Sequence, residues 1–578
     1  MLRFLDCKLQ DCQPSDLQFA GLKTGPPTRT VVAYPLRRLR LGQPAYTNTM
    51  ENSMLQRFLL LSLIPYAFLS MPAQAQTPPN QTPTEIPEPA PKQLEQADST
   101  ATVPAPVETT TSKNSLEARL KQLEEEVKQL HSQKPQPVSP AAESAPASAE
   151  PFAWGDFTWL NGGSRQTSRL LDSKYFTPQI DIDTNYTFSL NQPIDNTIVG
   201  STATARHNEL SLAFLGAGGD AHIGNVRGRL FFQYGARSTV VPRNDLTVLR
   251  GQSDLYNAYR YLSEAYAGYH FNKLHGINID VGLFFAYVGL FSYTQFENWG
   301  YQASFTSDNT PWFFNGARLQ IFPTDRLKVE LWLINGWQSY GKFNQLPGVG
   351  YQLLYAPQEW VKMVFNGYVG TDTQNNASRV RFHSDNSVLV RYLNRPGSKG
   401  ISRAAFSATF DLGFEEGGGV TAFRGSHDAG NCTETAPCEQ DFISTMAYHM
   451  MWFWQNRIGW MVGGGFMRNP GRYLVLVPTG VAAATFDTRS GTEFTGWDLS
   501  SNVSWFANEQ LTFRAEISHH SASVPYYSGP GGVTGPDGYK CGGLYDPDGS
   551  IRTCAPSSWT PDLVSAETKL IFAALFRL

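Results

Sequence analysis

A long alternation of apolar and polar residues, which begins near residue 175 and runs to the end of the chain, constrains this sequence more than any other feature. Successive residues of a β-strand point to opposite faces, so the alternation predicts strands with one apolar and one polar face. It is clearest in 181–190, 327–333, 379–392 and 510–518. Strands of soluble sheets usually have about five or six residues, whereas a tilted strand needs about 9–11 residues to cross a bilayer. We therefore expect strands that cross a membrane.

The connections between these segments alternate in length. Short turns are predicted at 271–276, 323–326, 356–359, 454–457 and 507–510. Long stretches rich in Gly, Asn, Ser and Pro lie at 237–258, 287–310, 338–349, 413–440, 469–494 and 521–562. Short turns on one side and long loops on the other are typical of outer-membrane barrels. The sequence thus predicts an all-β fold, a transmembrane antiparallel up-and-down barrel of about 16 strands within 152–578, with both ends on the short-turn side.

The composition fits this fold but does not select it. Aromatic residues make up 13% of the chain, charged residues 17%, and there are 50 Gly, with a mean hydropathy of −0.30. A large soluble all-β protein has the same profile, so a soluble β-sandwich is an alternative. The net charge of −4 argues against nucleic acid as a partner, because that would require a basic face.

Residues 54–75 have the features of a cleaved signal peptide. Arg57 precedes an apolar stretch over 58–71, and Ala73 and Ala75 have the small-x-small spacing of a cleavage site, so the mature chain is expected to begin at Gln76. The apolar stretch is too short for a spanning helix and contains Pro65. We expect residues 1–53 to be a mis-assigned N-terminal extension, with translation starting at Met50 or Met54.

A linker, a short helix and a second linker follow. Residues 76–113 are rich in Pro and Thr and predict a disordered linker, and 133–151 predict a Pro/Ala/Ser linker. Between them, 114–132 carry apolar residues at alternating four- and three-residue spacing, which is a coiled-coil seam: Leu116, Leu120, Leu123, Val127 and Leu130. A helix this short is marginal alone, so we expect a homotrimer with a three-stranded stalk. A lone amphipathic helix on the barrel or cell wall is the alternative.

Four segments resemble the β-barrel porin-2 (OmpL-like) outer-membrane family. They are FAWGDFTWLNGGSR (152–165), DIDTNYTFSLN (181–191), PWFFNGARLQIFPTDRLKVELWLINGWQ (311–338) and the closing strand DLVSAETKLIFAALFRL (562–578). The closing strand ends in Leu578, where such strands usually end in Phe. The resemblance covers roughly 152–578 and implies a porin fold, the bacterial outer membrane and passive transport. It brings no catalytic residues, no cofactor and no defined substrate.

The polar faces of the strands are predicted to line a pore. The basic residues expected there are Arg227, Arg229, Arg318, Lys328, Lys362, Arg379, Arg381, Arg391, Arg403, Arg514 and Lys569. The acidic residues are Asp181, Asp183, Glu209, Glu330, Asp411, Glu516 and Glu567. The excess of bases favours a weak preference for anions. Pairing of facing charges across the wall is an equally good interpretation. The aromatic-rich stretch 287–310 is compatible with an inward constriction, a cap on the mouth or a contact with a neighbouring barrel.

The cysteines form two close pairs in predicted surface loops, Cys432/Cys438 and Cys541/Cys554, so we expect two disulfides and no metal site. No catalytic signature occurs: the run Gly425-Ser426-His427-Asp428 lies on one loop, whereas triad partners come from separate elements. We therefore expect a non-enzymatic porin for small hydrophilic solutes, in contact with outer-membrane lipid and lipopolysaccharide. The alternatives are a loop-plugged barrel that acts as a surface receptor or adhesin, and a barrel enzyme.

Overall fold

The structure is a computed structural model that describes residues 119, 121, 122 and 125, and residues 150–578 apart from 243–244, 246, 248–249, 427–432, 472, 474–492, 537 and 539–558. The chain divides into two compact units, Met1–Lys134 and Pro135–Leu578. In the first unit the four described residues are helical, within the predicted 114–132 helix. The signal peptide, the first linker, nearly all of the second linker and the seam residues lie outside the described residues.

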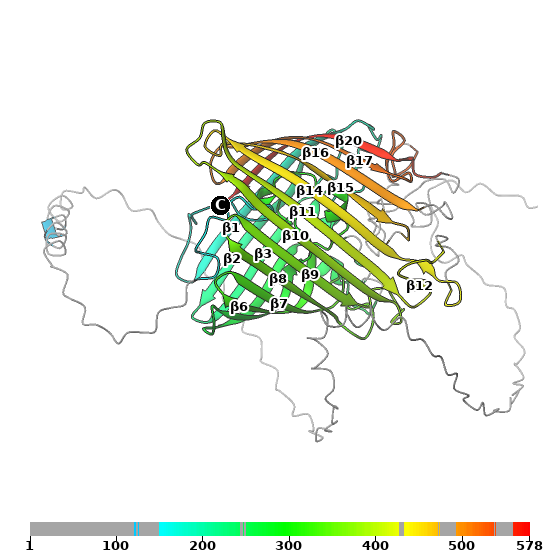
Figure 1. Cartoon of the computed structure of the whole chain (residues 1–578), viewed down its shortest axis with the longest axis horizontal. Coiled ribbons are helices and arrows are strands. Elements are labelled where there is room, and N and C mark those ends of the chain that lie inside the picture. The colour runs from blue at the N-terminus through cyan, green and yellow to red at the C-terminus, as the bar shows by residue number, and fades with distance from the viewer. Residues whose placement is uncertain are drawn as a thin grey trace, which may run out of the picture. The chain divides into compact units, whose positions relative to one another are not determined.

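Sixteen antiparallel strands close into a barrel (Figure 1). In order they are β1 (Phe176–Ser189), β2 (Leu210–Ile223), β3 (Val226–Tyr234), β4 (Leu262–Phe271), β5 (Ile277–Phe285), β6 (Phe313–Thr324), β7 (Leu327–Ile334), β8 (Gly348–Gln358), β9 (Val361–Gly370), β10 (Val380–Asn394), β11 (Ile401–Glu416), β14 (Asp441–Phe453), β15 (Ile458–Asn469), β16 (Phe494–Phe506), β17 (Leu511–Ala522) and β20 (Ala566–Arg577). The first strand pairs with the last, with Phe188 opposite Leu570, so the sheet has no free edge. The predicted barrel of about 16 strands is confirmed.

Small elements sit in the connections. Two short sheets pair β12 (Val420–Thr421) with β13 (Cys438–Glu439), and β18 (Tyr527–Ser528) with β19 (Leu563–Val564). The helices are α3 (Arg237–Val240), α4 (Leu255–Tyr259), η4 (Gln295–Glu297) and α5 (Phe305–Asp308). None of the helices in the described part of the chain is long and apolar enough to span a bilayer.

The two faces of the strands are sorted as the alternation predicts. In β20 the side chain of Phe572 is on the outside, with 55% of the residue exposed, whereas Glu567 and Lys569 are buried inside. The same sorting holds in β17, where Phe513 and Ile517 face outward and Arg514 and Glu516 inward. Exposed aromatic residues gather close to the short turns, as in the interfacial girdle of an outer-membrane barrel: Tyr355, Trp360, Tyr392, Trp454, Trp460 and Trp505.

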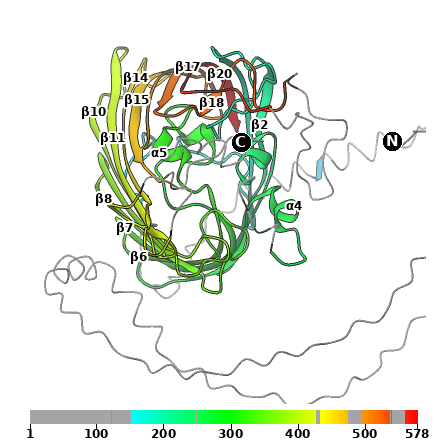
Figure 2. The ribbon, with the colours of Figure 1, turned by 90° about the vertical axis from the view of Figure 1, so that its right-hand side faces the viewer.

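The inside of the barrel contains a packed apolar core. The inward residues of β14 and β15 are largely apolar, and they are buried together with residues of the long connection between β5 and β6. The principal members from these two strands are Met446, Tyr448, Met450, Trp452 and Met461. Figure 2, which looks in at the end with the long connections, shows α5 of the β5–β6 connection inside the ring of strands. One sector of the lumen is therefore filled by protein.

Candidate functional site: the lumen of the barrel

The stretch 287–310, which we call the inner loop, folds into the barrel. Arg514 of β17 donates hydrogen bonds to the carbonyl oxygens of Gln295 (3.0 Å), Gly300 (2.9 Å) and Asn298. The carboxylate of Glu516 accepts from the backbone N–H groups of Tyr301 (2.6 Å) and Gln302 (2.8 Å). Arg514 and Glu516 thus face inward as predicted, but the inner loop covers them. Of the three placements open for this stretch, the structure shows the inward one.

Further charged groups fix the inner loop. Arg577 of β20 contacts Glu297 and donates to the hydroxyl of Thr294 at 2.8 Å. Further along the inner loop, Asp498 of β16 accepts from the hydroxyl of Ser304 (2.7 Å) and from the N–H of Phe305 (3.0 Å). These contacts bind the loop to several strands, so it forms a fixed part of the interior.

Asp308, at the end of α5, is an ionisable group of the inner loop itself. It accepts hydrogen bonds from the hydroxyl of Thr202 (2.6 Å) and from the side-chain amide of Gln302 (2.8 Å). Burial raises the pKa of Asp308 to about 6, although these donors and Lys569 favour the charged form. Docking of the inner loop is therefore expected to depend on pH.

The wall formed by β3 to β7 carries a row of ion pairs. Asp280 of β5 lies between two guanidinium groups, those of Arg227 (3.3 Å) and Arg318 (2.9 Å). Arg229 contacts Glu264 and lies 2.9 Å from Asp220. Lys328 lies 2.7 Å from Glu330. The predicted residues on this wall are thus each beside a group of opposite charge: Arg227, Arg229, Arg318, Lys328 and Glu330.

The other predicted basic residues are dispersed over the opposite wall. Arg391 and Arg403 both bind Asp156, a residue that precedes the barrel, at 3.2 and 2.9 Å. Arg381 pairs with Glu415 (2.8 Å), and Arg379, just before β10, lies 3.9 Å from the same carboxylate. Asp411 is buried beside His383 at 2.7 Å. Lys362 of β9 also faces inward and is half-buried.

Two expectations about charge are corrected by the structure. Glu209 precedes β2 and pairs with Arg206 in a largely exposed contact at 2.7 Å, so it does not belong to the inner wall. The expected excess of inward bases is also wrong, because further acids of the strands face inward: Asp220, Glu264, Asp280, Asp385, Glu415 and Asp498. The alternation within 259–271 and 276–286 carries the signal for Glu264 and Asp280, whereas Asp220 follows the glycine-rich run 216–219, which marks neither face.

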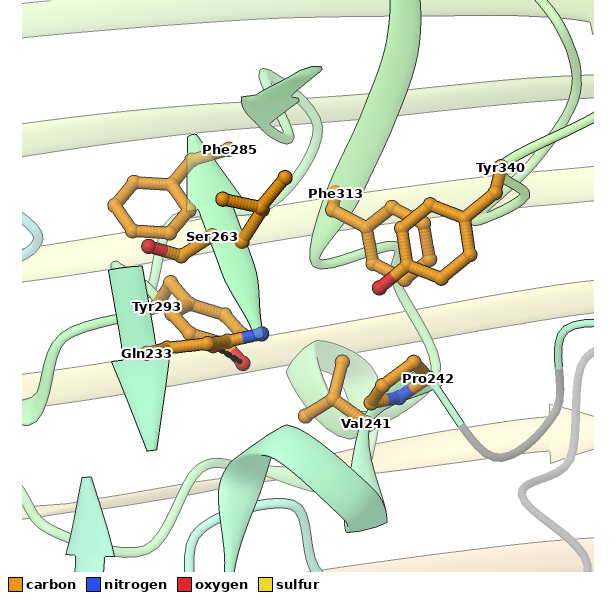
Figure 3. Close-up of a pocket in the computed structure, with 9 residues that line it drawn as sticks. Gln233, Val241, Pro242, Ser263, Phe285, Tyr293, Phe313 and Tyr340 are labelled. Carbon is orange, nitrogen blue, oxygen red and sulfur yellow. Dashed lines mark hydrogen bonds between the residues drawn. The ribbon is translucent and has the colours of Figure 1, made fainter. Parts of the chain in front are cut away.

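The apolar part of the interior leaves little free space where it meets α3. A cavity of about 10 Å³ is lined by residues that include Gln233, Val241 and Tyr293 (Figure 3). The hydroxyl of Tyr293 donates to Gln233 at 2.7 Å, and the ring of Phe313 stacks on Tyr340 at a centroid distance of 4.5 Å. A cavity of this volume holds one water molecule at most, so it does not provide a ligand site.

Metal-binding clusters and cysteines are the remaining candidate sites. Within 150–578, less the gaps given above, no group of three or more His, Cys, Asp or Glu side chains has metal-binding geometry. Cys438 belongs to β13, whereas Cys432, Cys541 and Cys554 lie outside the described residues.

Comparison with known proteins gives one match by sequence and several by structure. The family model described as "Putative beta-barrel porin-2, OmpL-like" matches residues 179–538, more than half of the chain. No curated protein matches. Among solved structures, in-vitro folded OmpT of Vibrio cholerae is 10% identical over 71% of this chain and 100% of that chain, with a TM-score of 0.38. The outer-membrane channel DcaP of Acinetobacter baumannii is 8% identical over 71% and 99%, with a TM-score of 0.41.

Proposed function

This chain belongs to the beta-barrel porin-2, OmpL-like family of outer-membrane porins, and from that premise we propose that it forms a narrow channel for passive diffusion of small hydrophilic solutes, with a weak preference for anions. The protein is a porin of the bacterial outer membrane. The single observation that carries the finer proposal is the row of ion pairs on the wall of β3 to β7, whose two halves differ in their access to water.

The basic half of this row faces the lumen more than the acidic half. The side chain of Arg227 is 30% exposed, while that of its partner Asp280 is fully buried. The side chain of Lys328 is 17% exposed, and that of Glu330 is 3% exposed. A solute that passes this wall therefore meets cations first, with their counter-charges behind them. The side chains of Arg229 and Glu264 are equally exposed, at 11% each. Asp220, whose side chain is 43% exposed, reverses the order and limits the preference.

Reversal potentials in a planar bilayer under a KCl gradient test this proposal. We expect the wild-type channel to be weakly anion-selective, Arg227→Gln to lose that preference, and Asp220→Asn to strengthen it. Arg206→Gln is the matched control, because Arg206 forms an exposed ion pair away from this wall. Cation selectivity of the wild-type channel, or equal shifts in Arg227→Gln and Arg206→Gln, would contradict it.

A loop-plugged barrel that serves as a surface receptor or adhesin is the second candidate, and the packed apolar core inside the barrel favours it. Both functions predict a stable barrel, but they differ in current. Single-channel recordings distinguish them, because a receptor of this kind would give no ion-conducting steps. We also propose that the protein is not an enzyme, since the family and fold are those of a channel.

Assembly and export complete the proposal. A homotrimer, held by barrel contacts and by the seam over 114–132, is what the short helix requires, and sedimentation in detergent would test it. Outer-membrane lipid and lipopolysaccharide are the surroundings expected for the apolar outer face. A signal peptide cleaved between Ala75 and Gln76 would direct export.

A further inference from the structure

Residues 152–167, which we call the strap, begin at one point on the short-turn rim of the barrel. The N–H of Phe152 and the indole N–H of Trp154 both donate to the carbonyl oxygen of Asp325, at 2.8 and 3.2 Å. The guanidinium of Arg326 lies 4.4 Å from the centre of the Trp154 ring. Asp325 and Arg326 form the turn between β6 and β7, so the strap starts there.

The strap ends on the opposite point of the same rim. The N–H of Thr167 donates to the carboxylate of Glu509 at 3.0 Å, and Gln166 donates to the carbonyl oxygen of Arg577 at 3.1 Å. Glu509 belongs to the turn between β16 and β17. From one turn to the other, the barrel order runs either through β7, β8, β9, β10, β11, β14, β15 and β16, or through β17, β20 and β1 to β6. Each path contains half of the strands, so the strap spans a diameter of the mouth.

The middle of the strap is fixed to the wall of the first half. Asp156 binds Arg391 of β10 (3.2 Å) and Arg403 of β11 (2.9 Å). Trp159 is fully buried, and its indole N–H donates to the carbonyl oxygen of Glu359 at 3.0 Å. Because the carboxylate of Asp156 bridges two guanidinium groups of the wall, it is the charged contact that holds the middle of the strap in place.

The strap also joins the inner loop. Trp299 of the inner loop donates from its indole N–H to the carbonyl oxygen of Trp159 (2.9 Å) and from its backbone N–H to Asn161 (2.8 Å). The N–H of Gly162 donates to the carbonyl oxygen of Glu297 at 3.2 Å. Gly162 has a φ of +71°, and a Cβ there would lie 2.3 Å from the carbonyl oxygen of Leu290. Glycine is therefore required for this close approach.

The inward residues of the lumen differ in their access to water. On the β7–β16 side, the inward residues Leu389, Ser407 and Met461 are fully buried. On the other side, Asp220 and Arg227 remain accessible to water. The inward residues of β17, β20 and β1, such as Glu516, Lys569 and Asp183, are buried as well, because the inner loop covers them. We propose that the strap and the inner loop together partition the lumen, sealing the side of β8 to β16 and the face of β17, β20 and β1, and confining solute to the part lined by β2 to β7, with Asp156 as the residue that holds the partition closed.

The partition is tested by thiol accessibility in the full-length protein. Arg227→Cys and Ser407→Cys place single added cysteines in the open and sealed parts of the lumen, and the unmodified parent controls for the native cysteines. With a charged methanethiosulfonate reagent, we expect Arg227→Cys to be labelled and Ser407→Cys to stay unlabelled, as read by mass spectrometry. Adding Asp156→Asn to Ser407→Cys should raise its labelling rate at least about tenfold, which is the effect of losing one charge-assisted hydrogen bond.

Conductance provides the second measurement, and this part rests on the proposed channel function. Asp156→Asn and Gly162→Ala should each increase the single-channel conductance, whereas Glu209→Gln, which disrupts an exposed pair elsewhere, should not. Equal labelling of Ser407→Cys and Arg227→Cys in the presence of the intact strap would overturn the partition. Absence of current in every variant, with the labelling difference preserved, would instead overturn the channel function and leave the partition standing.

Discussion

Replacing Arg514 by Met is predicted to release the inner loop from the barrel wall. The guanidinium is buried and donates to three carbonyl oxygens of the loop. Each hydrogen bond to a charged group contributes about 1.5–3 kcal/mol, but the three share one guanidinium and are not additive. Removing one partner of a buried charged network costs about 3–5 kcal/mol. The equilibrium between docked and released loop should thus shift by roughly 10²–10³.

Limited proteolysis with chymotrypsin measures this shift. The loop residues Phe296, Trp299 and Tyr301 are buried in the docked state, so the wild-type loop should resist cleavage. Cleavage of Arg514→Met within 287–310 should be faster by the factor given above, while the heat-modifiable gel mobility shows that the barrel itself remains folded. Arg206→Met is the matched control, since an exposed ion pair contributes at most about 1 kcal/mol. A cleavage rate for Arg514→Met equal to that of Arg206→Met would refute the reasoning.

Three further predictions follow from other parts of the molecule. Because the pKa of Asp308 is raised to about 6, its ionisation opposes docking above that pH, and the opposition vanishes as pH falls towards the ordinary Asp range. Loop cleavage, normalised to an unfolded substrate, should be level above about pH 6 and slow as the pH falls from about 6 to 4; an equal slope in Asp308→Asn would contradict this. Phe572→Arg, in the middle of the outer face of β20, should lower the free energy of unfolding in lipid by about 2–4 kcal/mol, whereas Phe423→Arg, exposed outside the barrel strands, should not; equal urea midpoints would count against the outer face. Non-reducing peptide mapping should link Cys432 to Cys438 and Cys541 to Cys554, and four free thiols would exclude the disulfides.

The wall of the barrel could be predicted because its pattern is local. In β1, β10, β17 and β20, each residue's face follows from its position in the alternation, and the side chains of Asp181, Glu516 and Lys569 are buried inside the barrel. The end of β2 could not be placed, because the run of glycines near 216–219 lacks the side chains that mark a face.

The contents of the lumen could not be predicted from the sequence, because they depend on contacts between distant segments. Periodicity identifies two faces but does not reveal what covers the inner one, so the apolar inward residues of β14 and β15, such as Met446 and Met461, gave no sign of a packed core. The segment 152–165 is recognisable as a family motif. Its role, however, depends on contacts with Asp325, Glu359 and Glu509, which are remote in the chain. Trp154 and Trp159, which lie outside any predicted strand, are the local signal that this segment is buried.

The apolar interior of β14 and β15 has a consequence for attempts to enlarge the channel. If the segment that covers Met450, Trp452 and Met461 were removed, these side chains would line an unfilled apolar space in the lumen. Water withdraws from narrow apolar passages, and a dewetted passage blocks ions without any solid obstruction. Deleting the covering segment would thus leave a dewetted, non-conducting passage along β14 and β15. A larger conductance would also require polar replacements of the apolar residues on these strands.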